Sequence, residues 1–353
     1  MRPILAAFIV LLAPFETVAT AQEAPSDEFK RRAALWLESA ESSKRQAAYL
    51  SYMQLGAEAM PMFQAALHKA ARAHNQRIDH LAGDSANPYA AHHDLARQLD
   101  DERERITPLI HTDWKKDPDK IRMLREEMDD LGRLHERTMK IAGANTTSFD
   151  AQVDGSVSAL FEIARQLERF EADRDSAGKD DDELRAFVLE DNIEGQLLIK
   201  QRERFRGSRR EIDAHAAATK ANTEAGRWAS APMRDFAALL NLQRSWLGLE
   251  PYLLEEKLCA AALGHSNDMA SLGFFSHTSP IPEKASPGQR ATLAGFQGGW
   301  SGENIFMGSA SHTAAFDGWF GSDGHRFIMF ASGPNRIGVG PSGKHWTMMT
   351  GKQ

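Results

Sequence analysis

The chain has 353 residues, which is too long for one small domain and favours two or three. Hydrophobic residues make up 42% and charged residues 26% of it, an ordinary balance that excludes disorder over the whole length. The formal net charge is -7, whereas a general nucleic-acid binder needs clustered lysines and arginines to neutralise phosphates. We therefore expect a folded protein with no nucleic-acid partner.

The N-terminus has the order of residues found in export signals. Arg2 precedes an apolar run at 4–13, and a small-residue A-x-A pattern ends at Ala21. This order predicts a signal peptide over residues 1–21, with cleavage before Gln22. The apolar run, about ten residues long, is too short to span a bilayer, and no later stretch predicts a membrane span. We expect export to the periplasm or the extracellular medium, with no transmembrane segment in the mature chain.

A single cysteine, Cys259, excludes an intramolecular disulfide. Its neighbours in EEKLCAAALGHS are apolar, which is typical of a small buried side chain rather than a reactive thiol. The domains of this exported protein must therefore be stable without disulfides.

Residues 22–225 are predicted to form a helical region. Apolar residues recur at helical spacing on both sides of Gly56, as in one HEAT-type helical pair. Between 184 and 212, four apolar residues lie on one row at multiples of seven, which Asp191 interrupts; such a row suits a helical bundle or a short coiled coil. We expect this region to be a scaffold that spaces or docks the C-terminal domain, with self-association as a further role.

The composition changes at 226–234, which we interpret as a linker before a C-terminal domain at 235–353. Helices are expected at about 233–247, 255–272 and 311–321, the first two ended by glycine. RIGVG and HWTMMTG then alternate as two strands around a PSGK turn, which indicates a hairpin. Helices followed by strands predict an α+β fold with an all-helical N-terminal region.

Three segments of the C-terminal domain supply candidate site residues: His277 in GFFSHTSP, Glu303 in GWSGENIFMG and His325 in SDGHRFIM. Two imidazoles, a carboxylate and a water suit an open zinc site, where the metal polarises a carbonyl or activates the water. The three residues are expected on separate loops, so their spacing does not distinguish a metal or catalytic site from polar groups that hold turns.

Nucleophilic hydrolysis is the alternative enzyme hypothesis. A serine would attack with a histidine as its base, and three serines lie near the candidate histidines: Ser276, Ser301 and Ser322. None of them is in a GxSxG elbow.

The order of these segments resembles the CAP superfamily (cysteine-rich secretory, antigen 5 and pathogenesis-related 1 proteins), in its bacterial SCP-like branch without disulfides. The resemblance runs over about 235–352, from LLNLQRSWLGLEPYLLEEKLCAAALGHS to HWTMMTG, and leaves the N-terminal two thirds uncovered. It implies an α-β-α sandwich with a cleft lined by two histidines and two acids, and maps His277, Glu303 and His325 onto three of them. The second acid falls at Ser322, so this chain departs from the pattern and does not support a mechanism with two carboxylates.

Other residues of this domain are predicted to be structural. Backbone geometry is the expected role of five glycines: Gly302, Gly308, Gly324, Gly338 and Gly340. The sandwich core is the expected place of five aromatic residues: Trp300, Trp319, Trp346, Phe274 and Phe296. His265 lies on the apolar stripe of its helix and is expected to be a hydrogen-bonded core histidine.

Family members that resemble this chain mostly act by binding. The resemblance therefore implies a non-catalytic extracytoplasmic binding module for a protein, lipid or cell-envelope ligand, with zinc or another divalent metal as a candidate cofactor on His277, His325 and Glu303. The alternative is a metal-assisted hydrolase of peptide or ester bonds at the cell surface, with the same three residues as catalytic candidates. A pure scaffold with a vestigial cleft is the third hypothesis.

Overall fold

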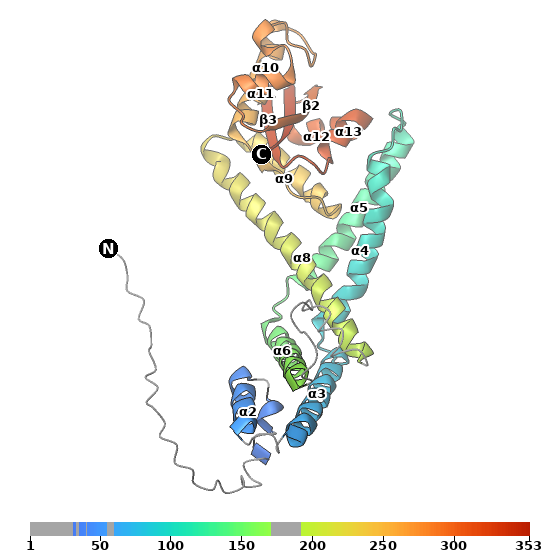
Figure 1. The fold of residues 1–353 in the computed structure, drawn as a ribbon. Helices are drawn as coiled ribbons and strands as arrows, with labels where there is room; N and C mark the ends of the chain where they lie inside the picture. Colours follow the sequence, from blue (N-terminus) through green and yellow to red (C-terminus); the bar gives the residue numbers. More distant parts are fainter. Residues whose placement is uncertain (1–30, 33–34, 40, 55–59, 171–191) are drawn as a thin grey trace, which may run out of the picture. The chain divides into compact units, whose positions relative to one another are not determined.

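The computed structural model describes residues 31–353, except 33–34, 40, 55–59 and 171–191 (Figure 1). The predicted signal peptide, Gly56 and Leu184 lie outside the described residues. The longer helices of the N-terminal part are α2 (Ser42–Gln54), α3 (Met60–Ala82), α4 (Pro88–Ile110), α5 (Pro118–Ala142), α6 (Thr147–Phe170) and α8 (Ile193–Glu224). The C-terminal part contains α9 (Ala231–Trp246), α10 (Glu256–Leu272), α11 (Pro287–Leu293), α12 (His312–Phe320) and α13 (Asp323–Met329), with strands β1 (Leu253–Leu254), β2 (Gly299–Met307), β3 (Arg336–Ser342) and β4 (His345–Lys352). The α+β prediction is confirmed.

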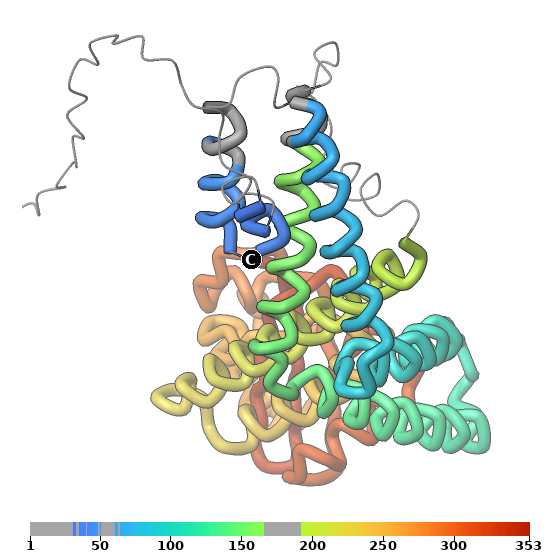
Figure 2. Tube along the Cα trace, turned by 90° about the horizontal axis from the view of Figure 1, so that it is seen from below, coloured from blue at the N-terminus to red at the C-terminus, as the bar shows by residue number. Residues whose placement is uncertain are grey.

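The chain forms two compact units. The first comprises Met1–Gln76 with Asp154–Val188, and the second comprises Arg77–Val153 with Leu189–Gln353. In the first unit, α3 and α6 lie side by side (Figure 2) and share a small apolar core that includes Leu67 and Ile163.

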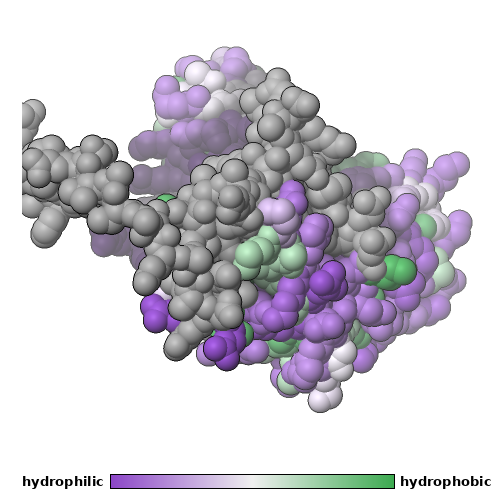
Figure 3. All heavy atoms as spheres, turned by 60° about the horizontal axis from the view of Figure 1, so that its bottom comes forward, coloured by the Kyte–Doolittle hydropathy of each residue, from purple (hydrophilic) through white to green (hydrophobic). Residues whose placement is uncertain are grey.

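The second unit joins helices of the N-terminal part to the C-terminal sandwich through one apolar core. Leu99 and Ile106 of α4 and Met128 of α5 belong to the same buried cluster as Phe236 of α9 and Trp319 of α12. On the face shown in Figure 3, the residues that are not drawn in grey are mainly hydrophilic. This shared core means that α4 and α5 are part of the fold around the sandwich.

Arg103 of α4 fixes this arrangement with partly buried hydrogen bonds. Its guanidinium donates to the carbonyl oxygens of Trp246, at 2.8 Å, and Ser245, at 2.7 Å, at the end of α9. It also pairs with Glu211 of α8 at 2.7 Å. One arginine thereby connects α4, α8 and α9, and it places its charge at a helix C-terminus, where the helix dipole favours a cation.

The sheet has the strand order β1-β3-β4-β2, with β1 parallel to β3 and the other pairs antiparallel. Alternation along β3 turns Ile337 and Val339 to the core shared with α9 and α12. The glycines between them, Gly338 and Gly340, face α10, where a Cβ would overlap the helix backbone. The α-β-α arrangement and the role expected of these two glycines are both found.

The aromatic prediction is correct at three of its five positions. Trp319, Trp346 and Phe296 are buried. Phe274 is partly buried beside the ring of His265, at a centroid distance of 5.8 Å. Trp300 is 42% exposed, so the prediction that it belongs to the core was wrong. It lies near the start of the edge strand β2, beside a register shift that turns its side chain outward.

Cys259 is 3% exposed and its Sγ accepts a hydrogen bond from the Val339 amide at 3.3 Å. Burial raises the pKa of its thiol to about 12. Relative to an ordinary thiol, the folded protein then holds about a thousandfold less thiolate. We expect a chromogenic disulfide reagent at pH 8 to modify Cys259 only after urea unfolding; stoichiometric modification of the folded chain within minutes would contradict this.

Within the ranges that the structure describes, no helix is long and apolar enough to cross a membrane.

Candidate functional site

The site is built around Glu303 on the edge strand β2. The register pairs Glu303 with Met349 of β4, whose side chain packs in the cluster formed by α10 and α11. Glu303 faces the same side, and its side chain is only 1% exposed. Sequence analysis placed this residue on a loop; it lies in a strand instead, because β2 is held by its pairing with β4 rather than by a local alternating pattern.

Arg290 neutralises the buried carboxylate. Its Nη2 donates to Glu303 Oε2 at 2.6 Å and to the His277 carbonyl at 3.0 Å, and its Nη1 donates to the Lys284 carbonyl at 2.8 Å. The side chain is 2% exposed. Sequence reasoning missed this residue, although a signal was present: Arg290 is the only arginine between residues 250 and 325, and a buried carboxylate needs a buried cation.

Helix α11 holds Arg290 in place through its N-terminus. Ser286 and Gln289 form a reciprocal capping box, in which the Ser286 hydroxyl accepts from the Gln289 amide and the Gln289 side chain accepts from the Ser286 amide. Pro287 occupies the first helical position, where its missing N–H costs nothing. Arg290 follows in the first turn and points toward β2.

His277 lies on the loop after α10 and contacts the other oxygen of the carboxylate. Its Nδ1 is 2.8 Å from Glu303 Oε1, and its side chain is 50% exposed. A carboxylate that is paired with arginine accepts hydrogen bonds only, so Nδ1 carries the proton in the neutral imidazole. Nε2 is then left with a lone pair, an orientation that carboxylates also impose on metal-binding histidines.

His325 occupies the first turn of α13, not the turn that the GHR sequence suggested. Its carbonyl oxygen accepts from the Asn304 side chain at 2.9 Å, which ties α13 to β2. Its Nδ1 is buried without a hydrogen-bond partner. Burial lowers the pKa of His325, and the nearby His277 and Lys116 lower it further. At neutral pH this imidazole is therefore uncharged, and it lies within electrostatic reach of His277.

A loop from the N-terminal half of the chain borders this region. Arg326, next to His325, is fully buried and donates to the carbonyl oxygens of Ile110 and Thr112, both at 2.9 Å. Asp323 accepts from Arg326 at 2.7 Å and from the Lys116 amide at 3.4 Å. No local sequence signal predicts these contacts, because about two hundred residues separate the partners.

The second acid of the CAP pattern is not replaced by a neighbouring carboxylate. Ser322 occupies the N-cap position of α13, and Asp323 is engaged by Arg326. Asp317 is 58% exposed and pairs with Arg125 of α5 at 2.9 Å. Among the described residues, Glu303 is therefore the one carboxylate in contact with His277, and both of its oxygens have partners.

The predicted three-residue metal site is not preformed. The described part of the chain contains no group of three His, Cys, Asp or Glu side chains placed to hold a metal ion. Glu303 does not fit as a direct ligand, because its side chain is only 1% exposed and is held by the Arg290 cation at 2.6 Å and by His277 at 2.8 Å. The imidazoles of His277 and His325 are the remaining candidate ligands.

The serines near the histidines do not form nucleophile–base pairs. The Ser276 hydroxyl accepts from the Thr278 amide at 3.1 Å, while the Ser276 carbonyl contacts His265 Nε2 at 3.0 Å. His265 is thus the hydrogen-bonded core histidine that was expected. Among the described residues, no serine hydroxyl is hydrogen-bonded to His277 or His325.

Comparisons with known proteins cover the sandwich alone. The family model described as "Cysteine-rich secretory protein family" (CAP) matches residues 237–344. An uncharacterized membrane protein of Bacillus subtilis, YlbC, is 32% identical over 109 residues, which are 31% of this chain and 31% of that protein. The chain thus matches about a third of the length of this curated relative.

Solved structures give matches over the same share of the chain. An extracellular protein with an SCP domain from Bacillus anthracis is 30% identical, with a TM-score of 0.33 over 35% of this chain and 40% of that one. An outer surface protein from Borrelia burgdorferi is 15% identical, with a TM-score of 0.30 over 35% of this chain and 92% of that one. A cysteine-rich secretory protein from Staphylococcus aureus is 15% identical, with a TM-score of 0.28 over 35% of this chain and 38% of that one.

The family match agrees in position with the resemblance found in the sequence, and the sandwich around β2, α11 and α13 has the expected order of elements. Residues 237–344 therefore form a CAP domain.

Proposed function

We propose that this chain is an exported protein whose CAP domain is a non-catalytic binding module. One observation carries the proposal: the Glu303 carboxylate is buried and bound on both oxygens by Arg290 and His277. A general base must lie within reach of the substrate proton, whereas the Glu303 side chain is only 1% exposed and is ion-paired with Arg290. Glu303 instead orients His277, whose exposed edge is available to a ligand.

The export proposal depends on residues 1–21, which have the order of a signal peptide. Expression of the full chain in a bacterial host, followed by fractionation and N-terminal sequencing, tests it. We expect the extracytoplasmic fraction to contain a chain that begins at Gln22. A chain that retains Met1 in the cytoplasmic fraction would contradict export.

A divalent metal on His277 and His325 is the candidate cofactor, and such a metal would supply Lewis acidity to a bound ligand. We expect calorimetry to show saturable zinc binding that is lost in the His277→Ala/His325→Ala double variant. Glu303→Gln should weaken binding about 10- to 100-fold, because losing the partner of a ligating histidine typically has this effect. The absence of zinc binding by the unmodified chain would eliminate the metal while leaving a metal-free binding module.

Turnover distinguishes the module from the metal-assisted hydrolase. We expect no zinc-dependent cleavage of ester or peptide reporters by the folded chain. Cleavage that chelation abolishes and zinc restores would favour the hydrolase.

The helical region is proposed to act as a scaffold for the CAP domain. The core shared by α4, α5 and the sandwich supports this role, as do the hydrogen bonds from Arg326 to the loop after α4. Protein, lipid and cell-envelope ligands remain the candidate partners, and self-association through the helical region is tested by sedimentation velocity over a range of concentrations.

A further inference from the structure

His92 of α4 is buried in the contact between α4 and α8. Its side chain is 0% exposed, and its ring packs edge-on against Phe205 of α8 at a centroid distance of 5.2 Å. Its Nε2 lies 3.0 Å from the Ser208 hydroxyl, whereas its Nδ1 is buried without a hydrogen-bond partner. The contact between the two helices therefore uses only one nitrogen of this imidazole.

This arrangement suits the neutral imidazole alone. In the neutral ring one nitrogen is a donor and the other an acceptor, so an Nε2–H that donates to Ser208 leaves Nδ1 unprotonated. Protonation of His92 would add an N–H and a full positive charge at Nδ1. A buried polar group without a partner is destabilising, and a buried charge without a partner is more so.

The cations around His92 increase the cost of protonating it. Burial lowers the pKa of His92 to about 4, and Arg204 of α8 and His93 of α4 act in the same direction. Both neighbours disfavour a second positive charge between the helices. His92 is therefore uncharged while the contact is closed at neutral pH.

The carboxylates of the surrounding helices are engaged elsewhere. Asp100 of α4 pairs with Arg204 at 3.6 Å, and Asp150 of α6 is bound by the Tyr89 hydroxyl. Among the described residues, no carboxylate and no charged group of α5 or α6 acts on the pKa of His92. A positive charge on this ring would therefore have no counterion.

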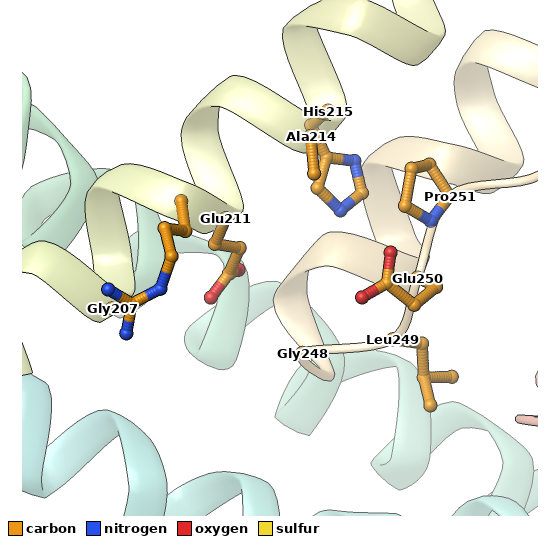
Figure 4. A pocket seen from close by; sticks show the side chains of 9 residues that line it. Gly207, Glu211, Ala214, His215, Gly248, Leu249, Glu250 and Pro251 are labelled. Atoms are coloured by element: carbon orange, nitrogen blue, oxygen red, sulfur yellow. The ribbon is translucent and has the colours of Figure 1, made fainter.

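The other histidines in contact with α8 lie beside carboxylates. His135 of α5 is 3.0 Å from Glu211 of α8. His215 lines the pocket between α8 and residues 248–251 together with Glu211 and Glu250 (Figure 4). Burial lowers the pKa of His215, but Glu211, a backbone hydrogen bond with Leu249 and Glu250 act against this effect, and only His135 adds to it. A positive charge on either imidazole would therefore lie beside a carboxylate.

Glu211 keeps its charge in mild acid. Burial opposes its ionisation, but the hydrogen bonds from His135 and Arg103 hold its pKa below the usual range. Arg103 donates to both of its oxygens, at 2.7 and 3.2 Å. The contacts of α8 around Glu211 therefore persist under conditions that favour protonation of His92.

We propose that α8 is an acid-sensitive element of the fold: protonation of His92 opens the contact between α4 and the Phe205–Ser208 turn, while the C-terminal half of α8 stays attached through Glu211. Histidine is suited to this role because its ordinary pKa lies close to neutrality. The opening does not involve the candidate site of the CAP domain. It gives the helical scaffold a response to acidification of the surrounding medium.

The sign of the effect follows from the two pKa values of His92. Its ordinary value of 6.5 applies when the contact is open, and the value of about 4 applies when the contact is closed. The closed contact is therefore most stable above pH 6.5 and loses stability as the pH falls toward 4. Between pH 7.5 and pH 4.5 the equilibrium constant for opening should rise about 70-fold.

Hydrogen exchange of the full chain, followed by mass spectrometry at both pH values, measures this opening once it is corrected for the pH dependence of intrinsic exchange. We expect peptides within 88–96 and 193–208 to lose protection in acid, and peptides within 211–224 to lose about tenfold less of it. Equal loss of protection along the whole of α8, or no loss, would overturn the proposal. This measurement uses the unmodified chain, so its result holds even where a variant fails to fold.

His92→Gln removes the titrating group and keeps a side chain that can form a hydrogen bond with Ser208. It should abolish most of the acid-induced opening, and His92→Phe, which keeps a ring against Phe205, should do the same. His135→Gln is the matched control, because this histidine contacts the same helix beside a carboxylate, and it should retain the opening at 193–208. Near-UV circular dichroism at pH 7.5 checks that each variant is folded. If both His92 variants open in acid as the unmodified chain does, another group is responsible and the proposal fails.

Discussion

Gly340→Ala is expected to lower the free energy of unfolding of the second unit by about 3 kcal/mol, at the upper end of the cost of overpacking. The added Cβ would overlap the backbone of Ala262 and Leu263 in α10. Helix backbone cannot rotate away as a side chain can, so α10 must move off the sheet. That movement would also break the hydrogen bond from the Ser266 hydroxyl to the Gly340 carbonyl, at 2.6 Å. Urea unfolding followed by tryptophan fluorescence measures the change.

Gly299→Ala is the matched control for this prediction. Gly299 lies at the start of β2 in the same sheet, and no heavy atom would lie within 4 Å of its added Cβ. We expect its urea midpoint to stay close to that of the unmodified chain. Equal midpoints for Gly340→Ala and Gly299→Ala would show that close helix packing is not what Gly340 provides.

The elements that the sequence predicted are those with local signals. Helix α10 ends where Gly273 adopts a φ of +70°, the left-handed conformation that glycine favours after a helix. The strands β3 and β4 alternate around the turn at Gly343, whose φ is +56°. Such patterns depend only on residues that are close in sequence. They also indicated that Gly338 and Gly340 have backbone roles.

The site itself depended on contacts that are distant in sequence. Glu303 was expected on a loop because Gly299, Ser301 and Gly302 hide the alternation of β2. Its strand exists through pairing with β4. The sequence identified the three candidate residues but not the ion pair that fixes the role of Glu303. That ion pair is formed by Arg290, which lies on a separate helix.

Arg290→Met is expected to destabilise the second unit by about 3–5 kcal/mol, the usual cost of breaking a buried ion pair. Methionine is similar in length to arginine but carries no charge, so the Glu303 carboxylate stays buried without its cation. Both side chains of the pair are at most 2% exposed. The His277 and Lys284 carbonyls lose their donors at the same time. Chemical unfolding of the variant at neutral pH measures the loss.

A double variant without either charge distinguishes the cost of an unpaired buried carboxylate from the cost of losing the other contacts of Arg290. We expect Arg290→Met/Glu303→Leu to be more stable than Arg290→Met alone, because two apolar side chains leave no unpaired buried charge. An exposed pair gives the matched comparison: Arg122, 70% exposed and 3.1 Å from Asp119, should be replaceable by methionine with no measurable change. If Arg290→Met is as mild as Arg122→Met, then Glu303 does not need its arginine, and its carboxylate is free to take part in chemistry after all.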